Sequence, residues 1–442
     1  MRKHSLRQQL LDEVHARTFS DFNGAGRFIR FVYLTERGDD QAIIDHVNTY
    51  LSTHGQDEMP SGSKFLQSDF DAFRLRIERH TEFVSVSIIE DGQAAKSGLA
   101  KNAFNKAEVD QAHRAQSPFQ FIDHMPAEIF HAIWLEVGGK PPLRFNQDKA
   151  KSMLASRAAP SNFIDDGAAQ LIISFDADDD GFSRAVIFNH HMSAARLGRM
   201  VQRVVEMETY RFLAMLGFAK AQSSGGKLSK LATSLSNLTR DLSKTISTGK
   251  DDHNQQVNLV KTLTNLSAKV EELYADTLYR MAATKAYREV FEARMAALKL
   301  NYLKDFQGIE GFIERRMTPA MQTCEAFSNR LDRVALRIER AGQLLQTQTE
   351  MQIQEQNRDL LQSMDKRASA QLRLQQTVEG LSIAALTYYG VGLVHYLAKG
   401  FPIEEWGADL DVIKALAVPI VGGLVFFIIR RTRRHITRDT EV

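Results

Sequence analysis

Two apolar segments close to the C-terminus constrain the fold of this chain more than any other feature. Residues 380–398 contain no Asp, Glu, Lys or Arg, and residues 410–429 contain only Asp411 and Lys414, close to the start of the segment. A helix of about 20 such residues spans the roughly 30 Å hydrocarbon core of a bilayer. Two buried core helices are the alternative interpretation. Adjacent segments of near-spanning length, joined by a short polar link, favour a hairpin of two transmembrane helices in a lipid bilayer.

The charges that flank these segments predict the orientation of the hairpin. Basic residues precede the first segment and follow the second, whereas the link between them is acidic. The basic residues are Lys366, Arg367, Arg373, Arg430, Arg431, Arg433, Arg434 and Arg438, and the acidic ones are Glu404, Glu405, Asp409 and Asp411. Because positive residues remain on the cytoplasmic side, we expect both long ends of the chain in the cytoplasm and the link outside.

The charge balance and the cysteine content exclude several classes of protein. The chain carries 56 Lys and Arg against 54 Asp and Glu, so no basic surface field indicates a nucleic-acid partner. The lone Cys324 cannot form an intrachain disulfide or a four-cysteine zinc site. Hydrophobic residues make up 43% of the chain, which is enough to bury cores and argues against broad disorder.

Short alternating patterns in the first 190 residues predict strands mixed with helices. Phe73, Leu75 and Ile77 alternate with charged residues, which is the period of a half-buried strand. Residues 176–181 have the composition of a tight turn, so the apolar runs on either side of them should form a hairpin. The predicted strands cover 27–35, 73–77, 84–88, 130–137, 171–175 and 182–188, and the predicted helices cover 5–17 and 39–53. We therefore expect an α/β domain with a largely antiparallel or mixed sheet.

The pattern becomes helical after this domain. No proline occurs between Pro160 and Pro319, and proline is the residue that breaks helix interiors. The predicted helices cover 193–216, 228–242 and 257–316. Pro319 should open the next helix. From Phe327 to Leu345, apolar residues recur in steps of three and four, which predicts a coiled-coil-like seam.

Together these patterns predict an α+β protein built from consecutive segments. They are a cytoplasmic α/β domain (1–190), a helical domain (191–318), a long stalk helix (319–377), a first transmembrane helix (378–398), an external acidic loop (399–409), a second transmembrane helix (410–429) and a basic cytoplasmic tail (430–442). For the stalk, a helical hairpin folded back on itself is the alternative, because any amphipathic helix shares the same apolar stripe.

Several blocks of sequence carry a family resemblance. They are EVHAR at 13–17, ERHTEF at 78–83, DGFSR at 180–184, EMETYR at 206–211, and the runs 315–324 and 372–382. In combination they resemble a bacterial family of predicted membrane-anchored proteins of unknown function, over nearly the whole chain. The resemblance implies membrane anchoring and supplies no catalytic residue. Together with the predicted hairpin, it leads us to expect a multi-pass protein of the bacterial cytoplasmic (inner) membrane with both termini in the cytoplasm. Within the fourth block, Glu208 and Arg211 stand three residues apart and can pair, and we expect a salt-bridge network between helices.

The order of the segments also resembles, more weakly, the CorA magnesium-channel superfamily. That superfamily combines a cytoplasmic α/β domain, a long stalk helix, a short acidic link and a basic tail, and it closes its first membrane helix with Gly-Met-Asn, often after Tyr. Here Tyr389-Gly390-Val391-Gly392 stands in a comparable place, without the Met and the Asn. The resemblance implies an oligomer that transports or senses a divalent cation, and the missing residues depart from the pattern of magnesium selectivity.

One acidic loop has residues suited to cation binding. Asp176, Asp178 and Asp180, followed by Gly181, match the opening of a calcium loop, but Ile187 occupies the twelfth position, where a bidentate Glu is needed. The pattern therefore favours a solvated hairpin turn with at most weak metal binding. No phosphate-binding loop, nucleophile elbow or dinucleotide fingerprint occurs. We expect no cofactor, no catalytic residue and no enzymatic activity.

Polar and small residues in the first membrane segment indicate helix packing. Ser382, Thr387 and Tyr389 should face protein or a cavity, and Gly390 and Gly392 permit close approach of helices. They predict a homo-oligomer. Two functions remain open: a CorA-like assembly that transports or senses a cation, and a non-transporting membrane scaffold whose cytoplasmic domain binds a protein partner. A continuous polar stripe along the first membrane helix would favour the former.

Overall fold

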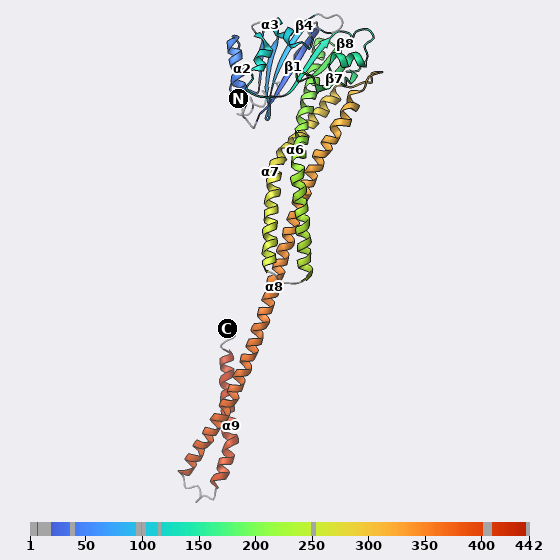
Figure 1. Cartoon of the computed structure of the whole chain (residues 1–442). Helices are drawn as coiled ribbons and strands as arrows, with labels where there is room; N and C mark the ends of the chain where they lie inside the picture. The colour runs from blue at the N-terminus through green and yellow to red at the C-terminus, as the bar shows by residue number, and fades with distance from the viewer. Residues whose placement is uncertain are drawn as a thin grey trace. The chain divides into compact units, whose positions relative to one another are not determined.

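The computed structural model describes residues 7, 19–35, 40–93, 99, 103–113, 116–248, 253–400 and 409–438. The chain divides into two compact units, Met1–Ala341 and Gly342–Val442. The first contains a mixed β-sheet followed by long helices, and the second ends in an apolar helix, so the predicted α+β class is confirmed. Figure 1 shows these elements. The predicted helix over 5–17, apart from Arg7, and most of the predicted loop over 399–409 lie outside the described residues.

Within the described residues the sheet has eight strands in the order β2-β3-β4-β1-β5-β8-β7-β6. The strands are β1 (Ala25–Leu34), β2 (Phe65–Asp69), β3 (Arg74–Arg79), β4 (Phe83–Gln93), β5 (Ile129–Gly138), β6 (Ser161–Ile164), β7 (Ala169–Ala177) and β8 (Phe182–Asn189). Neighbouring strands are antiparallel except β5 and β8, which are parallel, so the sheet is mixed. The short edge strands β2 and β6 have no counterpart among the predicted strands.

Both faces of this sheet are buried. Residues of one face, such as Phe31 and Trp134, pack with helices α2 (Gln41–Thr53), α3 (Lys106–His113) and α4 (Pro118–Asp123). Helix α5 (Gln147–Met153) packs beside β7 and β8. On the other face, Val32 packs against Leu213 of helix α6. The alternation in β3 is therefore not that of a half-buried strand, because Arg76, which the pattern places in solvent, is 0% exposed.

Three long helices follow the sheet: α6 (Ala194–Thr248), α7 (His253–Ala297) and α8 (Ile309–Lys399). Where the pattern predicts two helices, α6 is continuous through Gly225 and Gly226. Each glycine costs only about 1 kcal/mol in a helix, and the buried Leu228 and Leu235 extend the packed face. α7 ends well before the predicted end near residue 316. Pro319 lies inside α8 rather than at its start.

The segment between α7 and α8 covers one edge of the sheet. Lys299 and Asp305 have positive φ angles of 50° and 68°, which an α-helix does not accommodate. The backbones of Phe163 in β6 and Asn301 exchange two hydrogen bonds, of 3.1 and 2.8 Å. The side chain of Asn162 donates to the carbonyl of Asn301 and accepts a bond from the first N–H of α8. β6 is thus an edge strand whose free backbone groups are paired.

The long helices of the first unit pack through regularly spaced apolar residues. Figure 1 shows α6 and α7 side by side, and they approach closely at Gly217, where an added Cβ would lie 2.1 Å from Oγ1 of Thr284. Every apolar position of the predicted seam of α8 is buried, as expected for a packed helix face. These positions are Phe327, Leu331, Val334, Ile338, Ala341 and Leu345.

The second unit consists of the end of α8 and helix α9 (Leu410–Arg438). The two helices meet at Gly390, where an added Cβ would lie 2.6 Å from Cγ1 of Val421, and at Thr387, which lies against Gly422. Most of their large apolar side chains are exposed, among them Leu381, Leu386, Tyr388, Tyr389, Leu393, Tyr396, Ile420, Leu424 and Phe427. Among the described residues, α8 and α9 are the two helices that are long and apolar enough to cross a membrane.

Candidate functional site

Charged residues near the turn between β3 and β4 hold the sheet against its helices. Glu82 is 4% exposed, and its carboxylate accepts hydrogen bonds from Arg280 of α7, at 2.5 and 3.2 Å, and from the hydroxyl of Tyr287 at 2.5 Å. Arg79 donates to both carboxylate oxygens of Asp40 at 2.7 Å. These groups bond to the protein itself, so the ERHTEF block has a structural role.

A second set of ion pairs links α6 to α7, as the EMETYR block predicts. Arg211 donates to both carboxylate oxygens of Glu208, at 2.7 and 2.6 Å. Arg294 of α7 pairs with Glu206 of α6 at 2.5 Å. Both predictions of pairing are confirmed. Glu208 is fully buried and also accepts a bond of 3.2 Å from Ser183 of β8, so this network reaches the sheet.

Two buried groups on the central strand β5 have strongly shifted pKa values. Burial raises the pKa of Glu136 to about 7, against the opposing effect of Arg27. Its Oε1 accepts a bond of 2.7 Å from Nε1 of Trp134, and its Oε2 has no partner among the described residues. Burial lowers the pKa of His131 to about 4, and its ring stacks on Phe212. Neither residue is among the predicted site residues. The sequence signal that could have identified them is an ionisable residue within an otherwise apolar strand, where burial shifts the pKa.

The acidic turn between β7 and β8 is closed by its own hydrogen bonds. Oδ1 of Asp178 accepts from the backbone N–H of Asp180 at 2.9 Å and of Phe182 at 2.8 Å, and Oδ2 pairs with Arg184. Asp176 instead accepts a bond from a serine hydroxyl. Asp commonly serves turns as such a local acceptor. In the described part of the chain, no three His, Cys, Asp or Glu side chains are grouped so as to hold a metal ion.

The polar residues of the first apolar segment bond within their own helix. The hydroxyls of Ser382 and Thr387 donate to carbonyl oxygens four residues earlier, at 2.8 and 2.7 Å, which satisfies them without a second helix. Tyr389 is exposed. Gly390 packs against α9 of the same chain, whereas a Cβ built on Gly392 meets nothing within 4 Å. The two glycines therefore face different surroundings.

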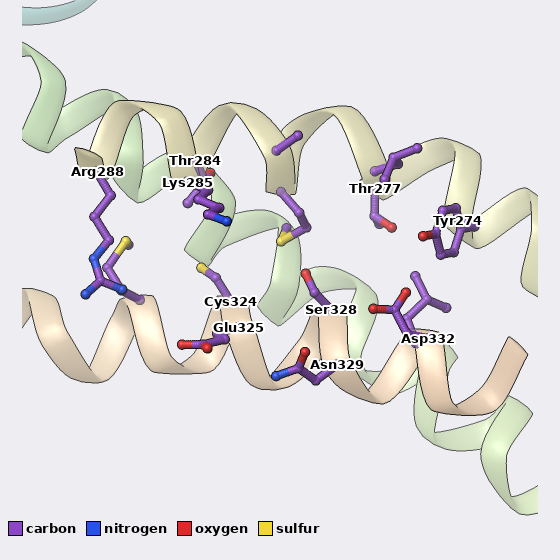
Figure 2. A pocket seen from close by; sticks show the side chains of 15 residues that line it. Tyr274, Thr277, Thr284, Lys285, Arg288, Cys324, Glu325, Ser328, Asn329 and Asp332 are labelled. Carbon is purple, nitrogen blue, oxygen red and sulfur yellow. The ribbon is translucent and has the colours of Figure 1, made fainter. Parts of the chain in front are cut away.

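A cavity of about 430 Å³ lies between α7 and α8 (Figure 2). Figure 2 shows the lining side chains extending toward one another from the two facing helices. Tyr274 of α7 bonds to Asp332 of α8, whose charge raises the pKa of the tyrosine. Met281 and Leu331 add apolar surface. The sequence patterns do not predict this cavity, because it depends on how the two helices are spaced.

The single cysteine of the chain lines the same cavity. Burial raises the pKa of Cys324 to about 11, so its thiol is protonated at neutral pH and a weak nucleophile. The neighbouring Thr284 lies against Gly217 of α6. A protonated, buried thiol gives no support for covalent chemistry in this cavity.

These features define an α+β protein whose sheet is fixed to long helices by buried ion pairs and whose last two helices expose apolar side chains. The chain belongs to the family described as "protein of unknown function (DUF3422)", whose sequence profile matches residues 2–436. The resemblance to a family of unknown function over nearly the whole chain is thereby confirmed. No curated protein and no solved structure matches the chain.

Proposed function

We propose that the protein is a membrane-anchored scaffold. The C-terminal hairpin holds the α+β unit at the cytoplasmic face of a bacterial inner membrane, and that unit binds a protein partner. One observation carries the proposal: in the most apolar windows of α8 and α9, only 11% and 6% of the residues are buried. Apolar surface left in water costs about 25 cal/mol for each Å², and extended exposed apolar surface marks contact with a membrane or a partner.

The flanking charges support this orientation. Arg430 and Arg431 follow the apolar part of α9, and Arg373 precedes that of α8. The positive-inside rule then places both long ends of the chain in the cytoplasm. Lys414, close to the start of α9, is able to extend its amine toward the opposite interface.

The residues of the first membrane helix favour the scaffold hypothesis and argue against the cation-channel hypothesis. Ser382 and Tyr389 lie on one face of α8, but Leu386 and Leu393 interrupt that face. Thr387 is turned toward α9 instead. A hydrated path for a divalent cation requires a more continuous polar lining than this. A CorA-like channel or sensor is the alternative function.

The proposal includes assembly of several copies through the hairpin. From Phe327 to Ala341 the seam of α8 is already buried within the first unit, so it needs no second subunit. In the second unit, the open surface at Gly392 beside the exposed Tyr389 lets another helix approach closely. The support for a homo-oligomer therefore comes from the hairpin.

Truncation after Gln375 tests the anchor. Removal of both apolar segments should move the protein from the membrane pellet to the soluble fraction, because no other described helix is long and apolar enough to span a bilayer. Ultracentrifugation after a high-salt wash measures the change. Truncation after Arg438 is the matched control and should leave the protein in the pellet. A Gln375 truncation that still sediments with washed membranes would contradict the anchor.

Reconstitution separates the scaffold from the channel. Full-length protein in liposomes that contain a magnesium-sensitive dye should give the same slow signal as protein-free liposomes. Magnesium entry that depends on the protein and scales with its amount would favour the CorA-like alternative. The truncation and the flux assay fail independently, so the membrane anchor and the choice between scaffold and channel are tested separately.

A further inference from the structure

A second cavity, of about 270 Å³, lies where β7, α6, the start of α8 and the segment before β6 meet. Its lining combines arginines with aromatic and apolar side chains. The charged and aromatic members are Arg157, Phe175, Asp176, Arg211, Phe312 and Arg316. They come from four separate stretches of sequence, so only the fold brings them together.

Four of these side chains form a continuous stack. The guanidinium group of Arg211 lies over the ring of Phe175, 5.1 Å from its centroid. Phe175 stacks on Phe312, with centroids 5.3 Å apart and an interplanar angle of 23°. The guanidinium of Arg316 lies over the Phe312 ring at 3.8 Å. Cation–π contacts are each worth about 0.5–2 kcal/mol, so the stack holds this wall of the cavity in a defined arrangement.

The arginines differ in how their charge is compensated. Arg211 is held by the buried Glu208. Among the described residues, neither Arg157 nor Arg316 makes an ion pair, and Arg316 donates to a carbonyl of its own helix at 3.4 Å. Asp176 also lines the cavity and accepts a bond from a serine hydroxyl. Two guanidinium groups against one carboxylate leave the cavity positively charged.

We propose that this cavity binds a small organic phosphate. Its phosphate group lies between Arg157 and Arg316, and its apolar part lies against Met215 and Met317, which also line the cavity. A single bidentate arginine satisfies a carboxylate, whereas the three terminal oxygens of a phosphate monoester accept bonds from two guanidinium groups at once. The charge of about −1.5 to −2 on a phosphate monoester at neutral pH matches two free arginines. The site is independent of the membrane anchor.

Calorimetric titration of the full-length protein in detergent with phenyl phosphate tests the site. Phenyl phosphate should bind with 1:1 stoichiometry. Inorganic phosphate lacks the apolar part and benzyl alcohol lacks the charge, so each should bind at least about tenfold more weakly. Short-chain phosphatidic acid distinguishes a lipid headgroup from a soluble ester. We expect it to bind more weakly than phenyl phosphate, because a cavity of about 270 Å³ does not hold two acyl chains.

Two variants and a matched control locate the binding. Arg157→Gln and Arg316→Gln should each weaken phenyl phosphate binding by at least about tenfold, since each removes a charge-assisted hydrogen bond. Arg157 is exposed and without an ion pair among the described residues, so its replacement should leave the melting temperature unchanged. The control is Arg315→Gln. It removes the same charge from the exposed residue next to Arg316, which does not line the cavity, and this variant should bind phenyl phosphate as tightly as wild type.

Three results would overturn the proposal. They are the absence of saturable binding of phenyl phosphate, wild-type affinity in both the Arg157 and Arg316 variants, and equal weakening by Arg315→Gln. The last would show general attraction by surface charge. If the stack only holds α8 against β7, Arg316→Gln would lower the melting temperature, and wild type would not bind the probe.

Discussion

The two units of this chain differ in which side chains they bury and which they expose. In the first, charged groups such as Arg30 and Glu78 are 3% and 6% exposed. In the second, Leu381 and Tyr388 are 73% and 77% exposed. Buried charges are tolerated when they are paired and hydrogen-bonded. Exposed apolar side chains are tolerated when the surroundings are not water. If the proposed membrane anchor is right, the second unit differs from the first because its apolar helices contact lipid instead of water.

Removal of one charge from a buried pair should have the largest effect on the first unit. Arg30 donates to Glu78 at 2.9 Å and to Ser87 at 3.0 Å inside the sheet. Glu78→Gln should lower the free energy of unfolding by about 3–5 kcal/mol, because the guanidinium stays buried without its counter-charge. Denaturant unfolding of the full chain in detergent, followed by tryptophan fluorescence to which the buried Trp134 contributes, measures the loss.

The control for this prediction is an exposed pair. Asp148 and Lys151 lie 3.7 Å apart on the surface of α5. Asp148→Asn should change the free energy of unfolding by less than about 0.5 kcal/mol. Similar losses in the two variants would show that burial does not set the difference between them.

The converse test introduces a charge at an exposed apolar position in each unit and compares the free-energy cost. Ile420 is 66% exposed and lies in the middle of the apolar part of α9, and Leu143 in the first unit is 94% exposed. Ile420→Arg should cost about 2.5–3.5 kcal/mol of membrane insertion. Leu143→Arg should change the stability by no more than about 0.5 kcal/mol. Alkaline carbonate extraction measures insertion. Full retention of the Ile420→Arg variant in the membrane pellet would contradict the proposal that α9 contacts lipid.

The two glycines of α8 sharpen the comparison within the hairpin itself. Gly390→Leu should destabilise the packing of α8 on α9 by about 1–3 kcal/mol, because the new side chain overlaps Val421. A Cβ built on Gly392, in contrast, meets nothing within 4 Å, so we expect Gly392→Leu to fit within the hairpin. It should leave the hairpin intact and reduce the number of subunits seen by native mass spectrometry. An unchanged subunit number in the Gly392 variant would exclude this face from the proposed assembly.

The smallest expected effect is a pH dependence that two groups of β5 largely cancel. The pKa of Glu136 rises from its ordinary value of 4.5 to about 7 on folding, so its contribution to stability falls as the pH rises through that window. The pKa of His131 falls from 6.5 to about 4, so its contribution grows as the pH rises through that window. Between about pH 4.5 and 6.5 the two slopes oppose each other, each being at most about 1.4 kcal/mol per pH unit.

Single substitutions should separate these slopes. Glu136→Gln should leave a stability that increases with pH up to about 6.5, and His131→Asn should leave one that decreases toward about pH 7. Denaturant unfolding at several pH values within the window measures both. If the free energy of unfolding varied with pH in the same way in both variants, the pKa values of these two groups would not change on unfolding as proposed.

The sequence patterns predict the interior of the sheet better than its edges. Strands with clear apolar alternation, such as β3 and β4, lie where they are predicted. β2 and β6 are short and partly polar, and their pairing with neighbours defines them as strands. The burial of Arg76 depends on Ser20, to which it donates at 2.8 Å, and such a contact between distant residues leaves no local pattern.

Helix ends and the residues that line the second cavity are harder to predict from the sequence, for physical reasons. α7 stops where non-glycine residues adopt positive φ, so the usual Gly or Pro signal is missing. α6 continues through two glycines because its packed face continues. The pairing of Glu208 with Arg211 is local and therefore predictable. The stack of Phe175, Phe312 and Arg316 joins a strand to a helix more than a hundred residues away, and only the tertiary fold reveals it.

The backbone pairing of β6 with the segment before α8 has a consequence for biosynthesis. Asp165 and Phe163 donate to carbonyls of Leu298 and Asn301, which the ribosome adds only after all of α6 and α7. At about 5–20 residues per second, the edge of the nascent sheet stays uncovered for roughly 7–30 s. During that interval a chaperone that recognises free strand edges has access to β6, and neighbouring nascent chains on a polysome are able to compete for it.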